Sequence, residues 1–153
     1  MAATALAGIA LDQATKALAV ANLDPANPPR LFDGLLRLQL IRNPGAAFSL
    51  GSGATVAISV LAIVAALAMV LVVAPRITQR WHGLLAGMAT AGIVGNLLDR
   101  LLRPPGVLRG HVVDFFQLPH FAIFNVADIF ITGTAVAMLV LAFRGEPDER
   151  SEG

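Results

Sequence analysis

Two aspartates, Asp114 and Asp128, lie within a mostly apolar stretch that covers residues 110–132. Between residues 34 and 145 the only other acidic residue is Asp99. A charged carboxylate is costly in apolar surroundings, so its presence indicates a function. Two carboxylates held close together in a low dielectric cannot both ionise, and one of them keeps a proton. The ionised partner can activate water while the protonated one polarises a carbonyl, so we expect Asp114 and Asp128 to form a catalytic pair.

Other chemistries have weaker support in the sequence. A Ser-Lys pair could be drawn from Ser49 and Lys16, but nothing in the run FSLGSG marks Ser49 as activated. His111 and His120 could ligate a metal together with the aspartates, yet there is no HExxH motif, no histidine pair at helical spacing and no Gly-rich phosphate loop. The chain has no cysteine, which excludes disulfides, thiolate metal sites and a cysteine nucleophile. We therefore expect no metal and no other cofactor.

The composition predicts that membrane helices position these residues. The chain has 153 residues, of which 56% are hydrophobic and 14% are charged, and its mean hydropathy is +0.73. An ordinary soluble domain carries about 25% charged residues, so this balance indicates a bilayer as the solvent. The net charge is only +1 and the basic residues are scattered, so no nucleic-acid partner is expected. We predict one integral-membrane domain over residues 1–153, in contact with membrane lipid.

The predicted fold class is all-α, a bundle of four transmembrane helices with a small extramembrane β-element between the first two. Each predicted span is an apolar run suited to a hydrocarbon core roughly 30 Å thick. The third contains small residues such as Gly87 and Gly95, which let helices approach closely, so we expect it at the centre of the bundle. A polar tail over residues 145–153 is expected to be disordered. The predicted spans cover residues 2–21, 54–74, 83–101 and 124–143.

Polar residues within the spans fall at helical spacing. Asp12 and Lys16 are four residues apart in the favourable acid-before-base order, which predicts an ion pair on one helix face. This pair could be structural, or it could act toward a substrate. Asn96, Asp99 and Arg100 also share one face, at the end of the third span. For Asp99 we expect a structural role, as a helix-end cap or a partner of Arg100.

Turn signals and alternation predict the β-element over residues 30–50. The run LRLQL alternates apolar and polar residues, as a half-exposed strand does. Asn43 and Gly45 flank a proline in a predicted turn. Residues 101–121, which include Asp114, are expected to form a connecting loop, with nearby proline and phenylalanine side chains fixing the aspartate.

The alternating direction of the four spans brings the polar residues to one membrane face. The first span ends, the second begins, the third ends and the fourth begins on the same side. A random scatter of structural polar residues would not gather in this way, so we predict a site there. Arginines flank both membrane faces, so counting charges leaves the orientation open. The residues that converge are Lys16, Asn43, Asn96, Asp99, Arg100, Asp114, Asn125 and Asp128.

Four sequence blocks, in order along the chain, resemble those of the lipoprotein signal peptidase family, also called signal peptidase II or prolipoprotein signal peptidase. Each block alone is a weak signal, but together they reach from residue 11 to residue 128 and are specific. The blocks are LDQATK at 11–16, RNPGAAFS at 42–49, GNLLDRL at 95–101, and VVDFF with FNVAD at 112–116 and 124–128.

The resemblance implies four transmembrane helices with both termini cytoplasmic, a β-cradle at the outer face and an aspartyl dyad on Asp114 and Asp128. It implies hydrolysis of the peptide bond before the lipidated cysteine of a diacylglyceryl prolipoprotein, with no cofactor and no obligate protein partner. It also implies a multi-pass protein of the bacterial cytoplasmic membrane with its active site toward the outer face. The implied supporting residues are Asp12, Lys16, Asn43, Gly45, Asn96, Asp99, Arg100 and Asn125.

Two other classes of function remain open on the residues alone. A small transporter or ion-conducting protein could use the same intramembrane acids as proton or ion sites. Against this, no polar residues continue along the second or fourth span toward the opposite face. A non-catalytic assembly factor would tolerate replacement of both aspartates by asparagine.

Overall fold

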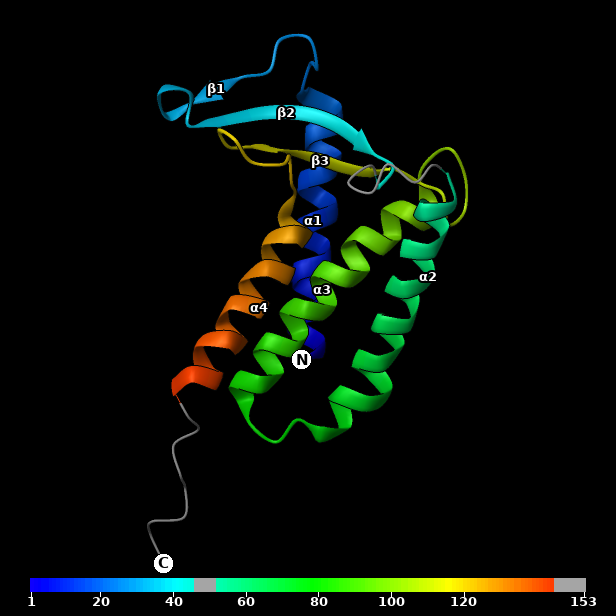
Figure 1. Ribbon diagram of the computed structural model, residues 1–153, viewed down its shortest axis with the longest axis vertical. Helices are drawn as coiled ribbons and strands as arrows, with labels where there is room; N and C mark the ends of the chain where they lie inside the picture. The colour runs from blue at the N-terminus through cyan, green and yellow to red at the C-terminus, as the bar shows by residue number, and fades with distance from the viewer. Residues whose placement is uncertain (46–51, 145–153) are drawn as a thin grey trace, which may run out of the picture.

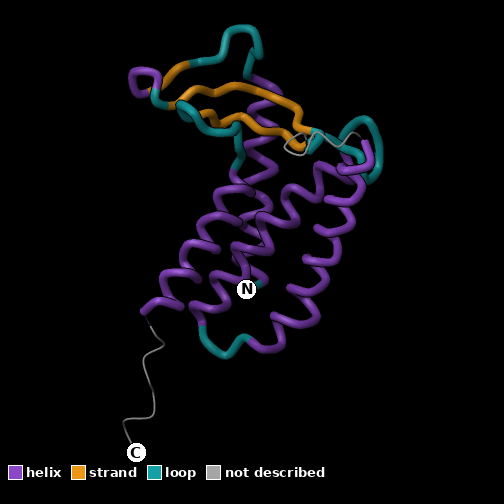
Figure 2. The backbone as a smooth tube through the Cα atoms, viewed as in Figure 1, coloured by secondary structure: helices purple, strands orange, loops and turns teal. Residues whose placement is uncertain are grey.

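The computed structural model describes residues 1–45 and 52–144, and it consists of a helical bundle with a small sheet lying across one end (Figure 1). Helices run roughly side by side, and the strands cross above them (Figure 2). The elements are α1 (Ala2–Asn22), β1 (Arg30–Leu31), the 3-10 turn η1 (Phe32–Gly34), β2 (Leu36–Asn43), α2 (Ser52–Ala68), the π-helical turn η3 (Met69–Val73), the 3-10 turn η4 (Ala74–Arg76), α3 (Arg80–Leu102), β3 (Val112–Gln117) and α4 (Val126–Arg144).

The predicted spans correspond to the helices of the structure, with ends that differ by a few residues. Among the described residues, three helical stretches are long and apolar enough to cross a membrane: residues 54–76, 80–102 and 126–143. Helix α1 has 21 residues, about 31 Å, but the charged Asp12 and Lys16 interrupt its apolar run. That α1 forms a fourth span therefore stays a prediction.

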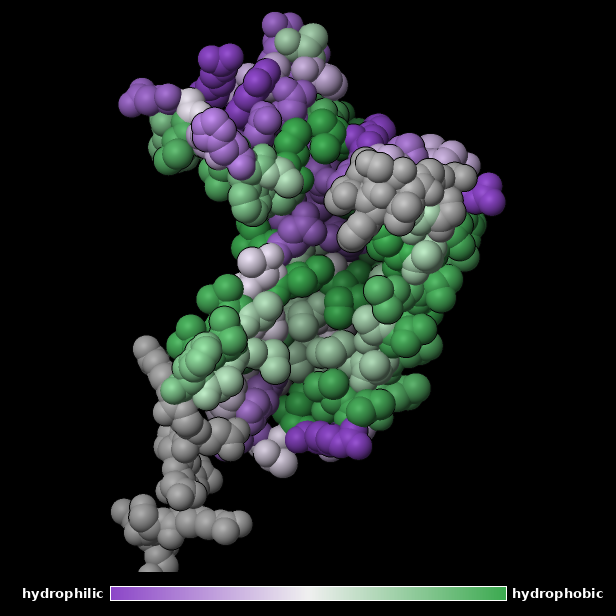
Figure 3. Space-filling model, in the orientation of Figure 1, coloured by the Kyte–Doolittle hydropathy of each residue, from purple (hydrophilic) through white to green (hydrophobic). Residues whose placement is uncertain are grey.

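Apolar side chains cover much of the outer surface of the helices, while polar ones gather on the sheet (Figure 3). Leu61 and Leu71 on the outside of the stretch 54–76 are 68% and 69% exposed, although large apolar side chains are normally buried in water-soluble proteins. Such a surface is suited to lipid. The chain is an integral membrane protein.

Helix α3 lies at the centre of the bundle and packs against α1, α2 and α4, which confirms the expectation from its small residues. A Cβ atom on Gly95 would lie 2.6 Å from Oδ2 of Asp12, and one on Gly92 would lie 2.5 Å from the carbonyl oxygen of Ala127. These contacts leave no room for a side chain. Glycine thus lets α1 and α4 approach α3 closely enough to share one polar site.

The sheet is antiparallel with the order β1-β2-β3, and its third strand corrects the prediction of a loop over residues 101–121. Strand β3 pairs with β2, with Asp114 opposite Ile41 and a β-bulge between Leu38 and Ile41. Its sequence did not alternate visibly because both faces are covered: Val113 and Phe115 are buried with Ala19 of α1, while Asp114 faces the site. The predicted β-element was therefore incomplete.

Two parts of the sequence interpretation lie outside the described residues. Ser49, considered for a Ser-Lys pair, belongs to residues 46–51, as does the last part of the predicted β-element. The predicted disordered tail, residues 145–153, also lies outside them.

Candidate active site

Strand β3 holds Asp114 above the ends of the helices, with only 2% of its surface exposed. Each of its carboxylate oxygens accepts a hydrogen bond from an amide. Asn43, at the end of β2, donates its Nδ2–H to Oδ2 at 2.9 Å, and Asn125 donates its Nδ2–H to Oδ1 at 2.6 Å. The predicted loop aspartate is thus fixed by a strand and two amides.

Backbone N–H groups fix the orientation of both amides. The N–H of Gly45 donates to Oδ1 of Asn43 at 2.8 Å, and the N–H of Asp128 donates to Oδ1 of Asn125 at 3.1 Å. Because each amide oxygen is engaged, the NH₂ group of each must face Asp114. Gly45 has φ +95°, a left-handed conformation that favours glycine. The turn at Asn43 therefore sets the donor that the aspartate meets.

Asp128 lies in the first turn of α4 and forms a reciprocal cap with Asn125. The N–H of Asn125 donates to Oδ2 of Asp128 at 3.1 Å, while the side chain of Asn125 accepts from the N–H of Asp128. This is the arrangement of a capping box, with Asn125 as the N-cap residue and the acid three residues later. Asn96 of α3 donates to the other oxygen of Asp128 at 2.8 Å. Asp128 is only half-buried, so water can reach it.

Asn125 is the residue that joins the two aspartates. Its side-chain NH₂ contacts Asp114 and also donates to Oδ1 of Asn96 at 3.1 Å, while its backbone N–H contacts Asp128. It has no exposed surface. The predicted pair is therefore brought together by one amide residue.

Burial raises the pKa of Asp114 from 3.8 to about 6, since desolvation penalises the charged form. The hydrogen bond from Asn43 opposes this shift, the nearby charge of Asp128 adds to it, and the bond from Asn125 and the charge of Lys16 oppose it again. The result is a carboxyl group that exchanges its proton close to neutral pH.

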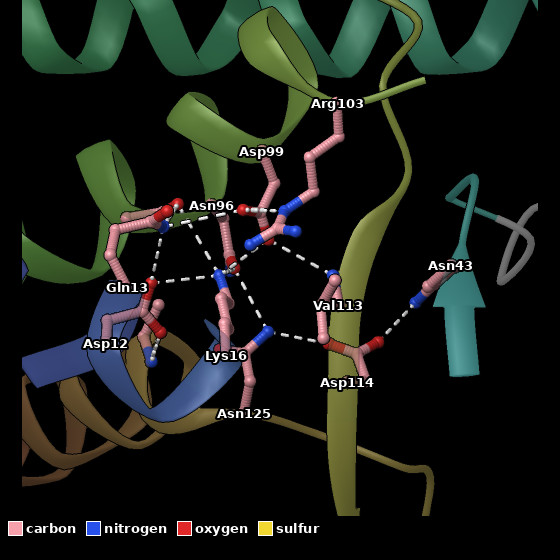
Figure 4. A network of polar contacts seen from close by, with 12 residues as sticks. Asp12, Gln13, Lys16, Asn43, Asn96, Asp99, Arg103, Val113, Asp114 and Asn125 are labelled. Carbon is pink, nitrogen blue, oxygen red and sulfur yellow. Dashed lines mark hydrogen bonds and ion pairs between the residues drawn. The ribbon is translucent and has the colours of Figure 1, made fainter. Parts of the chain in front are cut away.

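Lys16, which is fully buried, lies at the centre of a second cluster (Figure 4). Its ammonium is 2.9 Å from Oδ2 of Asp12 and 2.9 Å from Oδ2 of Asp99, and it donates to Oδ1 of Asn96 at 2.9 Å. The ion pair predicted from the i, i+4 spacing is present. Because Asn96 also donates to Asp128, a continuous chain of contacts links the ammonium to the candidate dyad.

The two acids of this cluster also hold backbone groups of distant elements. Asp12 accepts from the N–H of Ala127 in α4 at 2.9 Å, and Asp99 accepts from the N–H of Val113 in β3 at 3.1 Å. Each backbone group lies next to one of the candidate catalytic aspartates in the sequence. The cluster therefore fixes both β3 and the start of α4 relative to α1 and α3.

Of the two structural roles expected for Asp99, pairing with Arg100 is not the one that the structure shows. Its Oδ1 instead accepts from Nε of Arg103 at 2.6 Å, one helical turn further along. Adjacent residues in a helix point in different directions, whereas residues four apart share a face. Arg100 is 8% exposed, and its Nη1 has no hydrogen-bond partner among the described residues.

Three positioning residues were missed in the sequence. Gln13 donates to the carbonyl oxygen of Gly95 at 3.0 Å and to Oδ2 of Asp12 at 3.1 Å. Thr55 and Ser59 of α2 donate to backbone carbonyls of the two loops beside the site, those of Pro44 and Leu108. The spacing of Thr55 and Ser59, four residues apart in an uncharged run, could have identified them.

No group of three or more His, Cys, Asp or Glu side chains that could hold a metal ion occurs within residues 1–45 and 52–144. In particular, His111 and His120 do not form such a group with the aspartates.

The fold resembles that of bacterial membrane enzymes. Two solved structures described as bacterial membrane enzymes align with TM-scores of 0.80 and 0.78, at 24% and 22% sequence identity. The alignments cover 94% and 98% of this chain, and 92% and 91% of the respective structures. At this identity the likeness shows the fold alone.

Sequence comparison then shows the family. The model of the signal peptidase II family matches residues 4–144, and the chain belongs to this family. It is 40% identical to a lipoprotein signal peptidase of Rhodococcus jostii, covering 97% of this chain and 76% of that protein. It is 46% identical to a lipoprotein signal peptidase of Bifidobacterium adolescentis, covering 94% of this chain and 75% of that protein.

Proposed function

We propose that this protein is an aspartic endopeptidase that removes the signal peptide from diacylglyceryl prolipoproteins, with Asp114 and Asp128 as its catalytic pair. Removal of prolipoprotein signal peptides is supported by the family match and by relatives named lipoprotein signal peptidase at 40% to 46% identity over most of the chain. The observation that carries the aspartic mechanism is the carboxylate pair joined by Asn125.

The pair can hydrolyse a peptide bond without a covalent intermediate. The oxygen of a water molecule attacks the carbonyl carbon while the ionised carboxylate takes one of its protons. The protonated carboxyl group gives its proton to the carbonyl oxygen, which forms a tetrahedral diol. In the second step the C–N bond breaks. The first carboxyl group then protonates the leaving nitrogen, and a diol hydroxyl returns a proton to the second.

The surroundings of the two aspartates differ in a way that suits this division of roles. Each aspartate accepts two hydrogen bonds, but Asp114 is buried and its pKa is raised to about 6, whereas Asp128 is only half-buried. A proton shared by the pair in the free enzyme is therefore expected to lie mainly on Asp114, and the proton distribution belongs to the pair as a unit. Asp128 is the better placed of the two to contact water.

The Lys16 cluster is proposed to position Asp128 rather than to react. Lys16 donates to the amide oxygen of Asn96, which turns the NH₂ group of Asn96 toward Asp128. The carboxylate is thereby held in one orientation before a substrate binds. Such fixed donors avoid reorganisation during the reaction.

We further propose that the protein lies in the bacterial cytoplasmic membrane as four spans, with the sheet and the active site toward the outer face. The four helices would place both ends of the described chain on the opposite side. A lipid-modified substrate would then approach laterally, with its lipid chains still within the surrounding bilayer.

The test is cleavage of a purified diacylglyceryl prolipoprotein, followed as a mobility shift on a gel. Asp114→Asn and Asp128→Asn should each lower the rate by at least about a thousandfold, because either change removes one of the two proton-transfer groups. Asp33→Asn, an exposed acid at the tip of the hairpin, is the matched control and should cleave normally. Turnover retained in either dyad variant refutes the assignment.

A further inference from the structure

A groove lies at the end of the bundle away from the candidate active site. Helix α2 with η3, and helix α4, flank the first half of α3 on its two sides (Figure 1). Between them is a cavity of about 580 Å³, within the size range of small-molecule sites. Residues that line it include Val73, Arg76, His82, Ala89, Thr134 and Met138.

The walls and floor of the groove are mostly apolar, and one wall contains a π-helical turn. Met69, Val72 and Val73 belong to the π-helical turn η3, and Ala86 and Ala89 of α3 form a flat floor of small side chains. A π-helical turn is uncommon and occurs frequently at functional sites. Thr134 is 4% exposed, and its hydroxyl has no partner among the described residues. The groove is thus formed by the helices yet not filled by them.

The mouth of the groove carries positive charge. Nη1 of Arg76 donates to the carbonyl oxygen of Val72 at 2.6 Å, which holds the guanidinium at the groove and leaves its other N–H groups for a ligand. Arg80 lies nearby in the sequence, and His82 lines the groove. None of the acidic residues in the described part lines the groove. They lie at the candidate active site or in the segment between α1 and β2: Asp12, Asp24, Asp33, Asp99, Asp114 and Asp128.

The same end has the features of a membrane interface. Trp81, which stacks on His82, is 38% exposed, and tryptophan is enriched where helices leave the hydrocarbon. Arginine next to such a residue lies at the level of lipid phosphates. An occupant of the groove would therefore have a charged part at the interface and an apolar part within the bilayer.

We propose that the groove binds an anionic glycerophospholipid of the leaflet at this end. One acyl chain lies along α3 between η3 and α4, and Arg76 binds the phosphate. This site is separate from the dyad and does not depend on the proposed peptidase activity.

Charge favours a lipid over the signal peptide of a substrate. Signal peptides begin with a positively charged region, followed by the apolar segment. If the apolar segment lay in this groove with its basic region at the mouth, that region would face Arg76 and Arg80. A phosphate is attracted to the same residues.

The experiment is native mass spectrometry of the full chain in detergent, without substrate, after addition of defined ligands. Phosphatidylglycerol and phosphatidylcholine with the same acyl chains both carry a phosphate but differ in the net charge of the headgroup, and soluble glycerol phosphate tests the headgroup alone. We expect one retained phosphatidylglycerol, weaker retention of phosphatidylcholine and no retention of glycerol phosphate. Equal retention of the two lipids refutes the proposal, and so does retention of glycerol phosphate without retention of either lipid.

Variants separate the two halves of the proposed site. Arg76→Gln should lower phosphatidylglycerol retention about fivefold, the effect of one basic residue near an anionic surface, and abolish the preference over phosphatidylcholine. Ala89→Phe, which fills the floor, should lower retention of both lipids. Arg109→Gln at the other end and Ala68→Phe on the exposed face of α2 are the matched controls. Unchanged retention in Arg76→Gln or Ala89→Phe overturns the assignment.

A diazirine analogue of methionine at position 138, which lines the groove, distinguishes the occupant directly without filling the floor. With phosphatidylglycerol and a prolipoprotein substrate both present, we expect a lipid adduct. An adduct to the signal peptide instead would assign the groove to the substrate and refute the lipid site. Neither result bears on whether Asp114 and Asp128 are catalytic, because that is measured by cleavage.

Discussion

Compared with the wild type, the variant Asp114→Asn should become more stable as the pH rises. The pKa of this carboxyl group is raised from 3.8 to about 6 by burial. For an acid whose pKa is higher in the folded state, folding takes up a proton. The stabilisation is therefore complete below the unfolded value of 3.8 and is lost as the pH rises through about 6. The neutral amide in the Asp114→Asn variant does not titrate, so the variant serves as the reference without this dependence on pH.

The expected size follows from the same shift. At about 1.4 kcal/mol for each pKa unit, the rise from 3.8 to about 6 corresponds to roughly 3 kcal/mol. Asparagine also introduces a cost, since its NH₂ group must face the NH₂ group of Asn43 or Asn125. That cost, about 1–3 kcal/mol, does not depend on pH. This cost lowers the free energy of unfolding of the variant by the same amount at every pH.

The measurement is the free energy of unfolding of both proteins in micelles, for example by steric trapping, between about pH 4 and pH 8. The wild type should lose about 2.5 kcal/mol relative to Asp114→Asn over this range, since a small part of the loss occurs below pH 4. Asp33→Asn serves as the control for losing one negative charge on the same side of the molecule. A difference that stays constant with pH, or that changes in favour of the wild type as the pH rises, refutes the account of Asp114.

Three further perturbations test the clusters around the dyad. Lys16→Met should destabilise the protein by about 3–5 kcal/mol, measured in the same unfolding assay, because Asp12 and Asp99 would be left buried without their cation. Asn125→Ala removes a hydrogen bond that lowers the pKa of Asp114, so if the proposed mechanism holds, the alkaline limb of kcat/KM should move to higher pH. Gly95→Ala should reduce both stability and cleavage, because its Cβ would lie 2.6 Å from Asp12; unaltered values in both assays would contradict the close approach of α1 and α3.

The residue types and their spacing were enough to predict much of the site. Alternating spans placed Asn96, Asp114 and Asp128 at one end of the bundle, and the structure brings these residues together through Asn125. The i, i+4 spacing likewise predicted the contact between Asp12 and Lys16. These predictions succeeded because helical periodicity and bilayer thickness constrain a membrane chain strongly.

Strand β3 could not be predicted in the same way. A strand with one exposed face alternates, but Val113 and Phe115 pack on α1 while Asp114 contacts amides, so no solvent-facing residues mark the pattern. The expectation that Asp99 pairs with Arg100 was wrong for a related reason. Its partners Lys16 and Arg103 depend on how α1 and α3 pack, whereas adjacency in sequence suggested Arg100.

The sheet joins segments that are far apart in the chain, and this has a consequence for biosynthesis. The hydrogen bond from Asn43 to Asp114 spans 71 residues, and β2 obtains its second partner strand only when β3 has been made. At roughly 5–20 residues per second, the ribosome needs about 4–14 s to cover that distance. During this time one edge of β2 is open to pairing with other chains. Both aspartates of the proposed dyad also emerge after the third helix, so a nascent chain that has completed only three helices carries neither of them.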